Sequence, residues 1–210
     1  MITFVSFHGG SLTSLEGAMD RLGFGHCRAA SPDQAAPDGP IVLAGSGPLD
    51  PAYAALKASG WWRELPQLAA AGRPVVGINL GLHLLAEGSE ESPKGGGLGL
   101  IPGLVRRLGP GLKVPHMGWA PVRQLGAHPL LPETPGGWLF FCHSHALEPA
   151  GSTLLVAVHG RPISVMECRG RTVGIQAQVE KSGRFGLALL EKTLTVLGEE
   201  PLGSLTPDFN

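Results

Sequence analysis

One short stretch, VVGINLG, constrains the fold of this chain more than any other part of its sequence. The apolar residues 74–78 pass into a second apolar run, residues 80–86, with no loop between them. Gly77 and Gly81 stand two residues before and two after Asn79. A buried strand that turns directly into a helix needs such glycines, because the sharp turn leaves no room for side chains beside it. The stretch predicts an elbow that projects Asn79 from the carboxyl edge of a sheet, beside a helix N-terminus able to stabilise an oxyanion.

The elbow by itself has a second interpretation. A carboxamide is not a usable nucleophile, and asparagine tolerates left-handed backbone angles better than most residues. Asn79 is therefore also compatible with a plain strand-to-helix turn that carries no chemistry. The rest of the sequence has to decide between the two.

Apolar segments before and after the elbow alternate between strand and helix patterns. The expected strands are residues 2–7, 41–44, 74–78, 98–107, 119–123, 138–142, 154–158, 162–168 and 172–177. The expected helices are residues 12–22, 51–58 with Asp50 as N-cap, 61–70, 80–86 and 184–197. This alternation predicts an α/β fold with a mostly parallel sheet covered by helices on both faces. A single domain over residues 1–197 is expected, with residues 198–210 as a loose tail because they lack a core pattern.

Charge and composition exclude several classes of function. The net charge of −1 gives no basic surface for nucleic acid, and no apolar run approaches eighteen residues, so no membrane span is expected. The 32 glycines and 19 prolines are expected in tight turns, because 43% hydrophobic and only 16% charged residues argue against disorder. Three cysteines without CxxC spacing suggest neither a disulfide framework nor a zinc knuckle. With no basic leader at the N-terminus, a reducing, cytoplasmic location is expected.

Several segments beyond the elbow share one resemblance. They are residues 77–85 (GINLGLHLL), 97–103 (GLGLIPG), 114–119 (VPHMGW), 141–145 (FCHSH) and 174–182 (GIQAQVEKS). In this order they resemble the class I glutamine amidotransferases, and in particular the glutaminase subunit of imidazole glycerol phosphate synthase. The match is collinear from residue 1 to about residue 197. The resemblance implies the three-layer, flavodoxin-like fold of that family, and no cofactor.

The resemblance also marks the positions of a catalytic triad. In the family a cysteine thiolate attacks the glutamine carboxamide, a histidine moves its proton, and a glutamate orients the histidine. Here Asn79 stands in the nucleophile position and Gln178 in the base position, while Glu180 is retained. Asparagine offers no ionisable nucleophile and glutamine no titrating base. The resemblance therefore implies a degenerate triad with no glutaminase activity.

Two further groups of residues follow from the resemblance. The implied substrate-binding positions are Gly45, Gly47, Leu80, His83, Glu91, His143 and Ser144. The implied contacts with the cyclase subunit are Ser11, Trp119, His145 and Lys181. The family glutamine after the elbow is replaced by His83, whereas the glycines of the scaffold are kept. Loss of the reactive side chains with retention of the scaffold glycines is expected of a domain that is retained for its structure and not for catalysis.

The sequence thus predicts a pseudoenzyme that acts as a structural or regulatory partner of the cyclase subunit in histidine biosynthesis. One alternative is an active amidotransferase with a non-standard nucleophile, for which Cys142 would have to lie in the elbow pocket beside a base. Another is a small-molecule module that binds glutamine or a related amide in the old pocket. A metal site built on His143 and His145 with His8 or His83 is not expected, because the spacing fixes no third ligand.

Overall fold

A nine-stranded sheet forms the centre of the computed structural model, which describes residues 1–7, 12–92 and 96–199. The strand order is β2-β1-β3-β4-β12-β11-β10-β7-β8. Five neighbouring strands are mutually parallel: β2 (His26–Ala29), β1 (Ile2–Val5), β3 (Ile41–Gly45), β4 (Val75–Asn79) and β12 (Thr172–Ile175). The other four continue the sheet antiparallel: β11 (Arg161–Arg169), β10 (Thr153–His159), β7 (His116–Gln124) and β8 (Gly136–His143).

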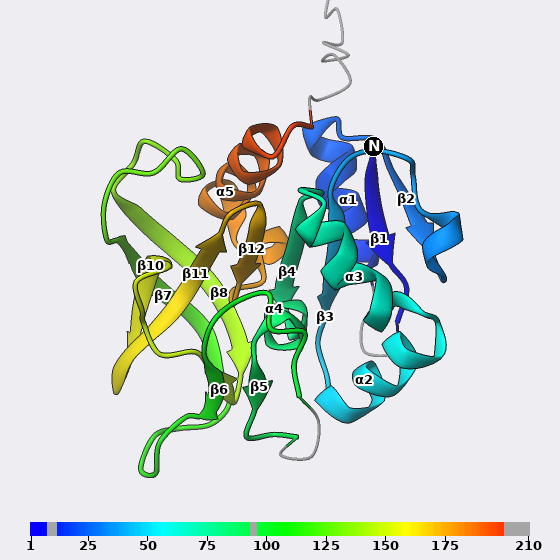
Figure 1. Cartoon of the computed structure of the whole chain (residues 1–210). Helices are drawn as coiled ribbons and strands as arrows, with labels where there is room; N and C mark the ends of the chain where they lie inside the picture. Colours follow the sequence, from blue (N-terminus) through cyan, green and yellow to red (C-terminus); the bar gives the residue numbers. More distant parts are fainter. Residues whose placement is uncertain (8–11, 93–95, 200–210) are drawn as a thin grey trace, which may run out of the picture.

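Helices cover both faces of the parallel half (Figure 1). One face packs against α1 (Thr13–Leu22) and α5 (Gly183–Val196). The other packs against α2 (Leu49–Ala58), α3 (Trp61–Ala70) and α4 (Leu80–Leu85). A small second sheet combines β5 (Gly88–Ser89), β6 (Leu104–Arg107) and β9 (His145–Ala146), and two 3₁₀ turns complete the fold, η1 (Pro32–Gln34) and η2 (Val179–Lys181). Within the described ranges no helix is long and apolar enough to cross a membrane.

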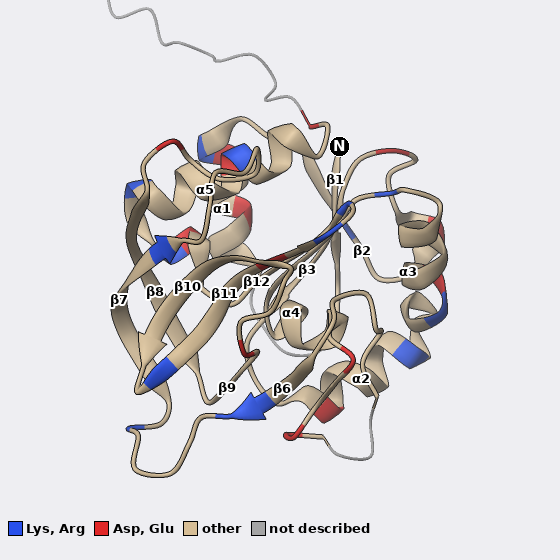
Figure 2. Ribbon diagram, turned by 60° about the vertical axis from the view of Figure 1, so that its left-hand side comes forward, with Lys and Arg blue, Asp and Glu red and all other residues tan. Residues whose placement is uncertain are grey.

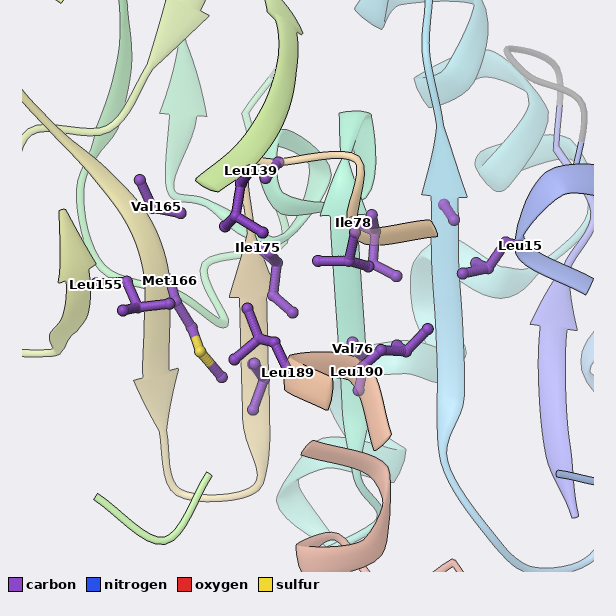
Figure 3. Close-up of a cluster of buried hydrophobic side chains, with 14 of the residues drawn as sticks. Leu15, Val76, Ile78, Leu139, Leu155, Val165, Met166, Ile175, Leu189 and Leu190 are labelled. Atoms are coloured by element: carbon purple, nitrogen blue, oxygen red, sulfur yellow. The ribbon is translucent and has the colours of Figure 1, made fainter. Parts of the chain in front are cut away.

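Alternate residues of the parallel strands belong to two separate apolar cores. On β4, Val76 and Ile78 face the α1–α5 side, where Leu189 and Leu190 of α5 pack against the sheet (Figure 3). Val75 faces the opposite side together with the helices α2 to α4. A strand buried on both faces has to be apolar throughout, which is why these strands read as continuous apolar runs. The two cores hold β4, and with it the elbow at its carboxyl end, rigidly in the middle of the sheet.

The expected α/β architecture with helices on both faces is confirmed, and the sheet is mixed. The strands expected after residue 150 are present, but they pair as hairpins. Gly160 alone connects β10 to β11, and a turn at Gly170 connects β11 to β12. Both glycines have a positive φ (69° and 60°), as tight turns require. A parallel pairing needs a crossover of a dozen residues or more, so connections this short allow only antiparallel neighbours.

Two expected element boundaries are wrong. Helix α2 begins at Leu49 with Pro48 in the N-cap position, and Asp50 instead accepts a hydrogen bond from the Ser92 hydroxyl. The strand expected over residues 98–107 begins only at Leu104. In both cases contacts between distant segments override the local pattern. Glu91 and Ser92 hydrogen-bond to the first residues of α2, and the main-chain N–H groups of Leu98, Leu100 and Ile101 donate to α4.

Candidate functional site

The elbow has the backbone that its sequence predicts. Strand β4 ends at Asn79 and α4 begins at the next residue. Asn79 has φ 55° and ψ −108°, and it is the one described residue other than glycine with a positive φ. A Cβ added at Gly77 would lie 2.6 Å from the carbonyl carbon of Gly81, and one added at Gly81 would lie 1.9 Å from the Leu43 oxygen. Neither position has room for a side chain, so the strained turn depends on both glycines.

Asn79 is buried at a point where three segments meet. It lies opposite Gly45 in the pairing of β3 with β4. Its side-chain amide donates to the main-chain oxygen of Cys142 at the end of β8, at 3.4 Å. Only 5% of the residue is exposed. The side chain therefore lies at the elbow as a hydrogen-bonding group with no acidic proton to lose.

Gln178 and Glu180 are brought to the elbow by a loop that is fastened to β8. The main-chain N–H of Gln178 donates to the main-chain oxygen of Phe140 at 3.0 Å. The Ser182 hydroxyl donates to the main-chain oxygen of Gln178 at 2.7 Å. It accepts from the main-chain N–H of Phe140 at 2.9 Å. Asn79, Gln178 and Glu180 consequently line one small cavity of about 50 Å³. The structure thus assembles the three positions that the sequence assigns to a triad.

In this small cavity neither Asn79 nor Gln178 can act as a nucleophile or as a base. The side-chain oxygens Gln178 Oε1 and Glu180 Oε2 are buried without a hydrogen-bond partner among the described residues. Burial raises the pKa of Glu180 above its usual value, because the charged carboxylate loses its hydration. In an active triad a histidine would occupy the space beside this carboxylate. Here the neighbouring side chain is an amide, which cannot take up or release a proton at ordinary pH.

A second cavity, of about 300 Å³, opens on the other side of the elbow. Its volume is at the lower end of the range for small-molecule sites. The residues that line it are Gly47, Asn79, Leu80, His83, Glu91, Pro115, Cys142, His143, Ser144 and His145. It thus collects every implied substrate-binding residue except Gly45, which lines the smaller cavity. We refer to it below as the amide pocket.

Two residues of the amide pocket were not assigned to it from the sequence. His145, expected at the partner surface, lines the pocket from β9, and Pro115 also lines it. Cys142 lines it too, at the place that the alternative with a non-standard nucleophile requires. Strand alternation gives Cys142 and His143 opposite faces of β8, so their side chains do not form a nucleophile and base pair. The VPHMGW and FCHSH motifs contain these residues, but sequence alone does not show that the two strands pair beside the elbow.

The histidines of the pocket are held by specific partners. His83 Nε2 lies 3.0 Å from Gln176 Oε1. His143 Nδ1 donates to the His145 oxygen at 2.9 Å, and its Nε2 lies 3.1 Å from His116 Nδ1. Burial lowers the pKa of His83 to about 4 and that of His143 to about 3. These two imidazoles are therefore neutral at pH 7 and add no positive charge to the pocket.

The buried histidines make the protein sensitive to acid. Their pKa values in the folded state lie below the ordinary value of 6.5, so the unfolded chain binds more protons between about pH 6.5 and pH 4. We expect the free energy of unfolding to fall through this window as the pH falls, by on the order of a few kcal/mol. Urea unfolding at pH 7.0, 6.0 and 5.0 measures this change in the free energy of unfolding. Because carboxylates also contribute to the pH dependence, the decisive comparison is with the variant His83→Gln. Its free energy of unfolding should fall less steeply with falling pH than that of the parent. An equally steep fall would contradict the lowered pKa of His83.

Trp119 and Lys181, the other implied partner contacts, lie at the surface. Trp119 is 53% exposed on β7, and its ring meets Phe140 edge-on at 6.1 Å between centroids. The ring also lies beside Gly183, close to the exposed Lys181. Met117 and Trp138 are 64% and 58% exposed on the same face of the β7–β8 hairpin, so this face is apolar. Ser11 lies outside the described residues.

No group of histidine, cysteine and carboxylate side chains in the described part of the chain could hold a metal ion. His8, one of the ligands considered from the sequence, lies outside that part. His143 and His145 do not combine with His83 into a set of ligands, because each has a protein partner of its own.

Two kinds of comparison with known proteins found similar proteins. No model of a known family matches the sequence. A protein of Symbiobacterium thermophilum named "Imidazole glycerol phosphate synthase subunit HisH" is 38% identical over 193 residues, which cover 90% of this chain and 91% of the relative. A protein of the same name from Moorella thermoacetica is 36% identical over 90% of this chain and 92% of its own length.

Solved structures show the same fold at lower identity. A structure described as a glutamine amidotransferase superposes with a TM-score of 0.76 at 15% identity, covering 94% of this chain and 98% of that chain. PurLQS from Thermotoga maritima gives a TM-score of 0.73 at 16% identity, covering 93% and 98%. Fold and sequence comparisons therefore lead to the same group of proteins along nearly the whole chain.

Proposed function

The chain belongs to the family of the imidazole glycerol phosphate synthase subunit HisH, and we propose that it is a member of this family without glutaminase activity. The observation that carries this proposal is Asn79 in the nucleophile position of a retained elbow. Its positive φ and the crowded glycines around it support the view that the backbone of an active site is retained. The side chain on that backbone cannot attack a carboxamide.

The base position supports the same conclusion. A triad acts as a unit, so the loss of one member removes most of the catalysis and the loss of a second removes little more. Gln178 sits in the cavity beside Asn79 and Glu180, but it cannot accept the proton that a nucleophile would have to lose. Glu180 then has no histidine to orient, in keeping with its unpartnered carboxylate oxygen.

We propose that the retained role is to dock on the cyclase subunit as a structural or regulatory partner in histidine biosynthesis. The exposed apolar face of the β7–β8 hairpin, with Trp119 at its centre and Lys181 nearby, supports a protein interface at this site. Large exposed aromatic side chains are typical of interface hot spots. The cyclase then draws ammonia from solution or from a second, active glutaminase.

The amide pocket supports a second role, the binding of glutamine or a related amide without hydrolysis. The pocket keeps a volume of about 300 Å³ and a carboxylate, Glu91, among its lining. Binding of the amide in the pocket would then signal to the cyclase, through the proposed contact between the two subunits, that the amide is available. This binding needs no nucleophile and no base.

The experiment that tests the proposal combines the purified protein with the cyclase subunit of the same organism. We expect a stable complex by calorimetry, no ammonia release from glutamine, and full cyclase activity when ammonium salts are supplied. Trp119→Ala should weaken the complex by about tenfold or more, as truncation of an interface tryptophan commonly does. Leu125→Ala, which removes an exposed apolar side chain beyond the end of β7, is the matched control and should change the affinity little.

Two outcomes would contradict the proposal. Failure to bind the cyclase under any condition would overturn the docking role. Ammonia release above background would overturn the loss of activity. If such release persisted in Asn79→Ala but disappeared in Cys142→Ser, the chain would be an amidotransferase with a non-standard nucleophile.

A further inference from the structure

One wall of the amide pocket is a continuous piece of chain. Residues 142–145, which run from the end of β8 into β9, all line the pocket. The segment leaves the large sheet at His143, the last residue of β8, which pairs with His116 of β7. At its other end His145 pairs with Arg107 of β6, the basic strand that lies beside β9 in Figure 2. The residue between these two pairings belongs to neither sheet, so other contacts have to fix the turn.

Two hydrogen bonds hold this turn. The main-chain N–H of Leu108 donates to the Ser144 oxygen at 2.9 Å. His143 Nδ1 lies 2.9 Å from the main-chain oxygen of His145, and because a carbonyl oxygen only accepts, Nδ1 carries the proton. Burial lowers the pKa of His143 to about 3, so its ring is neutral at pH 7 and Nε2 has no proton. The turn therefore depends on one particular tautomer of His143.

His116 supplies the donor that this tautomer needs. Its Nδ1 lies 3.1 Å from Nε2 of His143, and since Nε2 has no proton, the hydrogen bond requires a proton on Nδ1 of His116. The His116 ring stacks against Phe141 and His159, whose centroids lie 4.8 Å and 4.2 Å away at interplanar angles of 15° and 20°. The two bonded histidines are 7% and 6% exposed, so an unpaired nitrogen there would be costly.

We propose that His116 is a positioning residue of the amide pocket: by donating to His143 it selects the tautomer that closes the turn of residues 142–145. The inference rests on the proposed binding of glutamine-like amides in this pocket. Both ring nitrogens of His143 are occupied, so its ring offers the ligand no hydrogen bond and serves to shape the wall. His116 is absent from the described residues that line the pocket, and it acts on a ligand only through His143.

Loss of the donor would open the turn. With no donor at residue 116, His143 Nε2 would be a buried acceptor without a partner, which costs free energy. The ring regains a partner only by turning out to water, and this movement breaks the bond from Nδ1 to the His145 oxygen. Residues 142–145 would then no longer form a fixed wall.

The first test is the tautomer itself, read from the ring ¹⁵N signals of the full-length chain at pH 7. We expect His143 to be protonated at Nδ1 and unprotonated at Nε2, and His116 to be protonated at Nδ1. The His143 signals are assigned by their loss in His143→Gln. A proton on Nε2 of His143 in the parent protein would overturn the inference without any use of variants of His116.

The second test compares two substitutions of His116. His116→Phe keeps a ring that can stack but has no donor, whereas His116→Asn places a side-chain N–H at the position of Nδ1. We expect His116→Phe to weaken L-glutamine binding by about tenfold in calorimetry, and to speed hydrogen exchange of the main-chain N–H groups of residues 142–146. His116→Asn should stay within about threefold of the parent in both measurements. If only the stacked ring mattered, the order of the two variants would be reversed, and the inference would be overturned.

A matched control lies at the far edge of the sheet. Nδ1 of His26 on β2 lies 3.3 Å from the Phe24 oxygen, and its ring meets Phe4 edge-on. His26→Phe therefore makes the same substitution outside the pocket and should leave both measurements unchanged. Equal affinity and equal exchange in the parent and His116→Phe would overturn the inference and leave the proposed binding intact. If exchange follows the expected order but glutamine binds to no protein of the series, the binding role is overturned and the positioning of the turn stands.

Discussion

Glutaminase activity is expected to return when Asn79→Cys and Gln178→His are introduced together, and to stay at background when either is introduced alone. The reason is that the structure already brings residues 79, 178 and 180 together. The elbow backbone holds residue 79 in its strained conformation, and residue 178 lines the same small cavity as Glu180. The unpartnered Glu180 Oε2 would accept a hydrogen bond from the new imidazole. Because triad members act as a unit, the double variant should exceed each single variant by about a thousandfold or more.

The measurement is ammonia release from glutamine by each variant in complex with the cyclase. The matched control is the pair Asn79→Ala and Gln178→His, which restores the base without a nucleophile and should remain inactive. Equal activity in Asn79→Cys and in the double variant would show that another group acts as the base. No activity in a folded double variant that binds glutamine would show that the elbow has lost its catalytic geometry. His83 and His145 would then be the next positions to restore.

The second large effect concerns the stability of the elbow. Gly81→Ala is expected to lower the free energy of unfolding by more than about 4 kcal/mol, or to prevent the accumulation of folded protein. Its Cβ would lie 1.9 Å from the main-chain oxygen of Leu43, and both groups belong to buried backbone at the centre of the sheet. Neither β3 nor α4 can move away without opening the core between them.

A control for this prediction lies in α1. A Cβ added at Gly17 meets no atom within 4 Å, and the residue is inside a regular helix. Gly17→Ala should therefore raise the free energy of unfolding by about 0.5–1 kcal/mol, because alanine loses less conformational freedom in a helix than glycine. Urea or thermal unfolding of both variants tests the pair. A Gly81→Ala protein as stable as the parent would mean that β3 and α4 are farther apart in solution.

The elbow and the two apolar faces of the parallel strands could be predicted from the sequence because they depend on local pattern. The glycines around Asn79 are needed because the sharp turn leaves no room for side chains, and this requirement lies within a few neighbouring residues. Continuous apolar runs report burial on both faces of a strand. The pairing of the strands after residue 150 could not be derived in this way, because it depends on connection length as well as on pattern. The short turns at Gly160 and Gly170 decide it.

Part of the candidate site was likewise predictable and part was not. The resemblance located the residues of the small cavity and nearly all of the amide pocket. It placed His145 at the partner surface, whereas the structure puts its imidazole beside Glu91. The contact joins β9 to the segment after β5, fifty-four residues apart in the chain. Local sequence carries no information about which side chains meet across such a separation.

The sequence by itself determined which side chains stand at the elbow and beside it. Cysteine and histidine are absent from positions 79 and 178, and no fold can make an amide ionise as a thiol or an imidazole does. Only the tertiary structure decided what these side chains do instead. It curls the antiparallel half of the sheet so that the end of β8 reaches the elbow, where Asn79 bonds to Cys142. It also brings Nδ1 of His145 to 3.6 Å from Oε2 of Glu91. These relations arise from the pairing of distant strands, which is set by the packing of the whole domain.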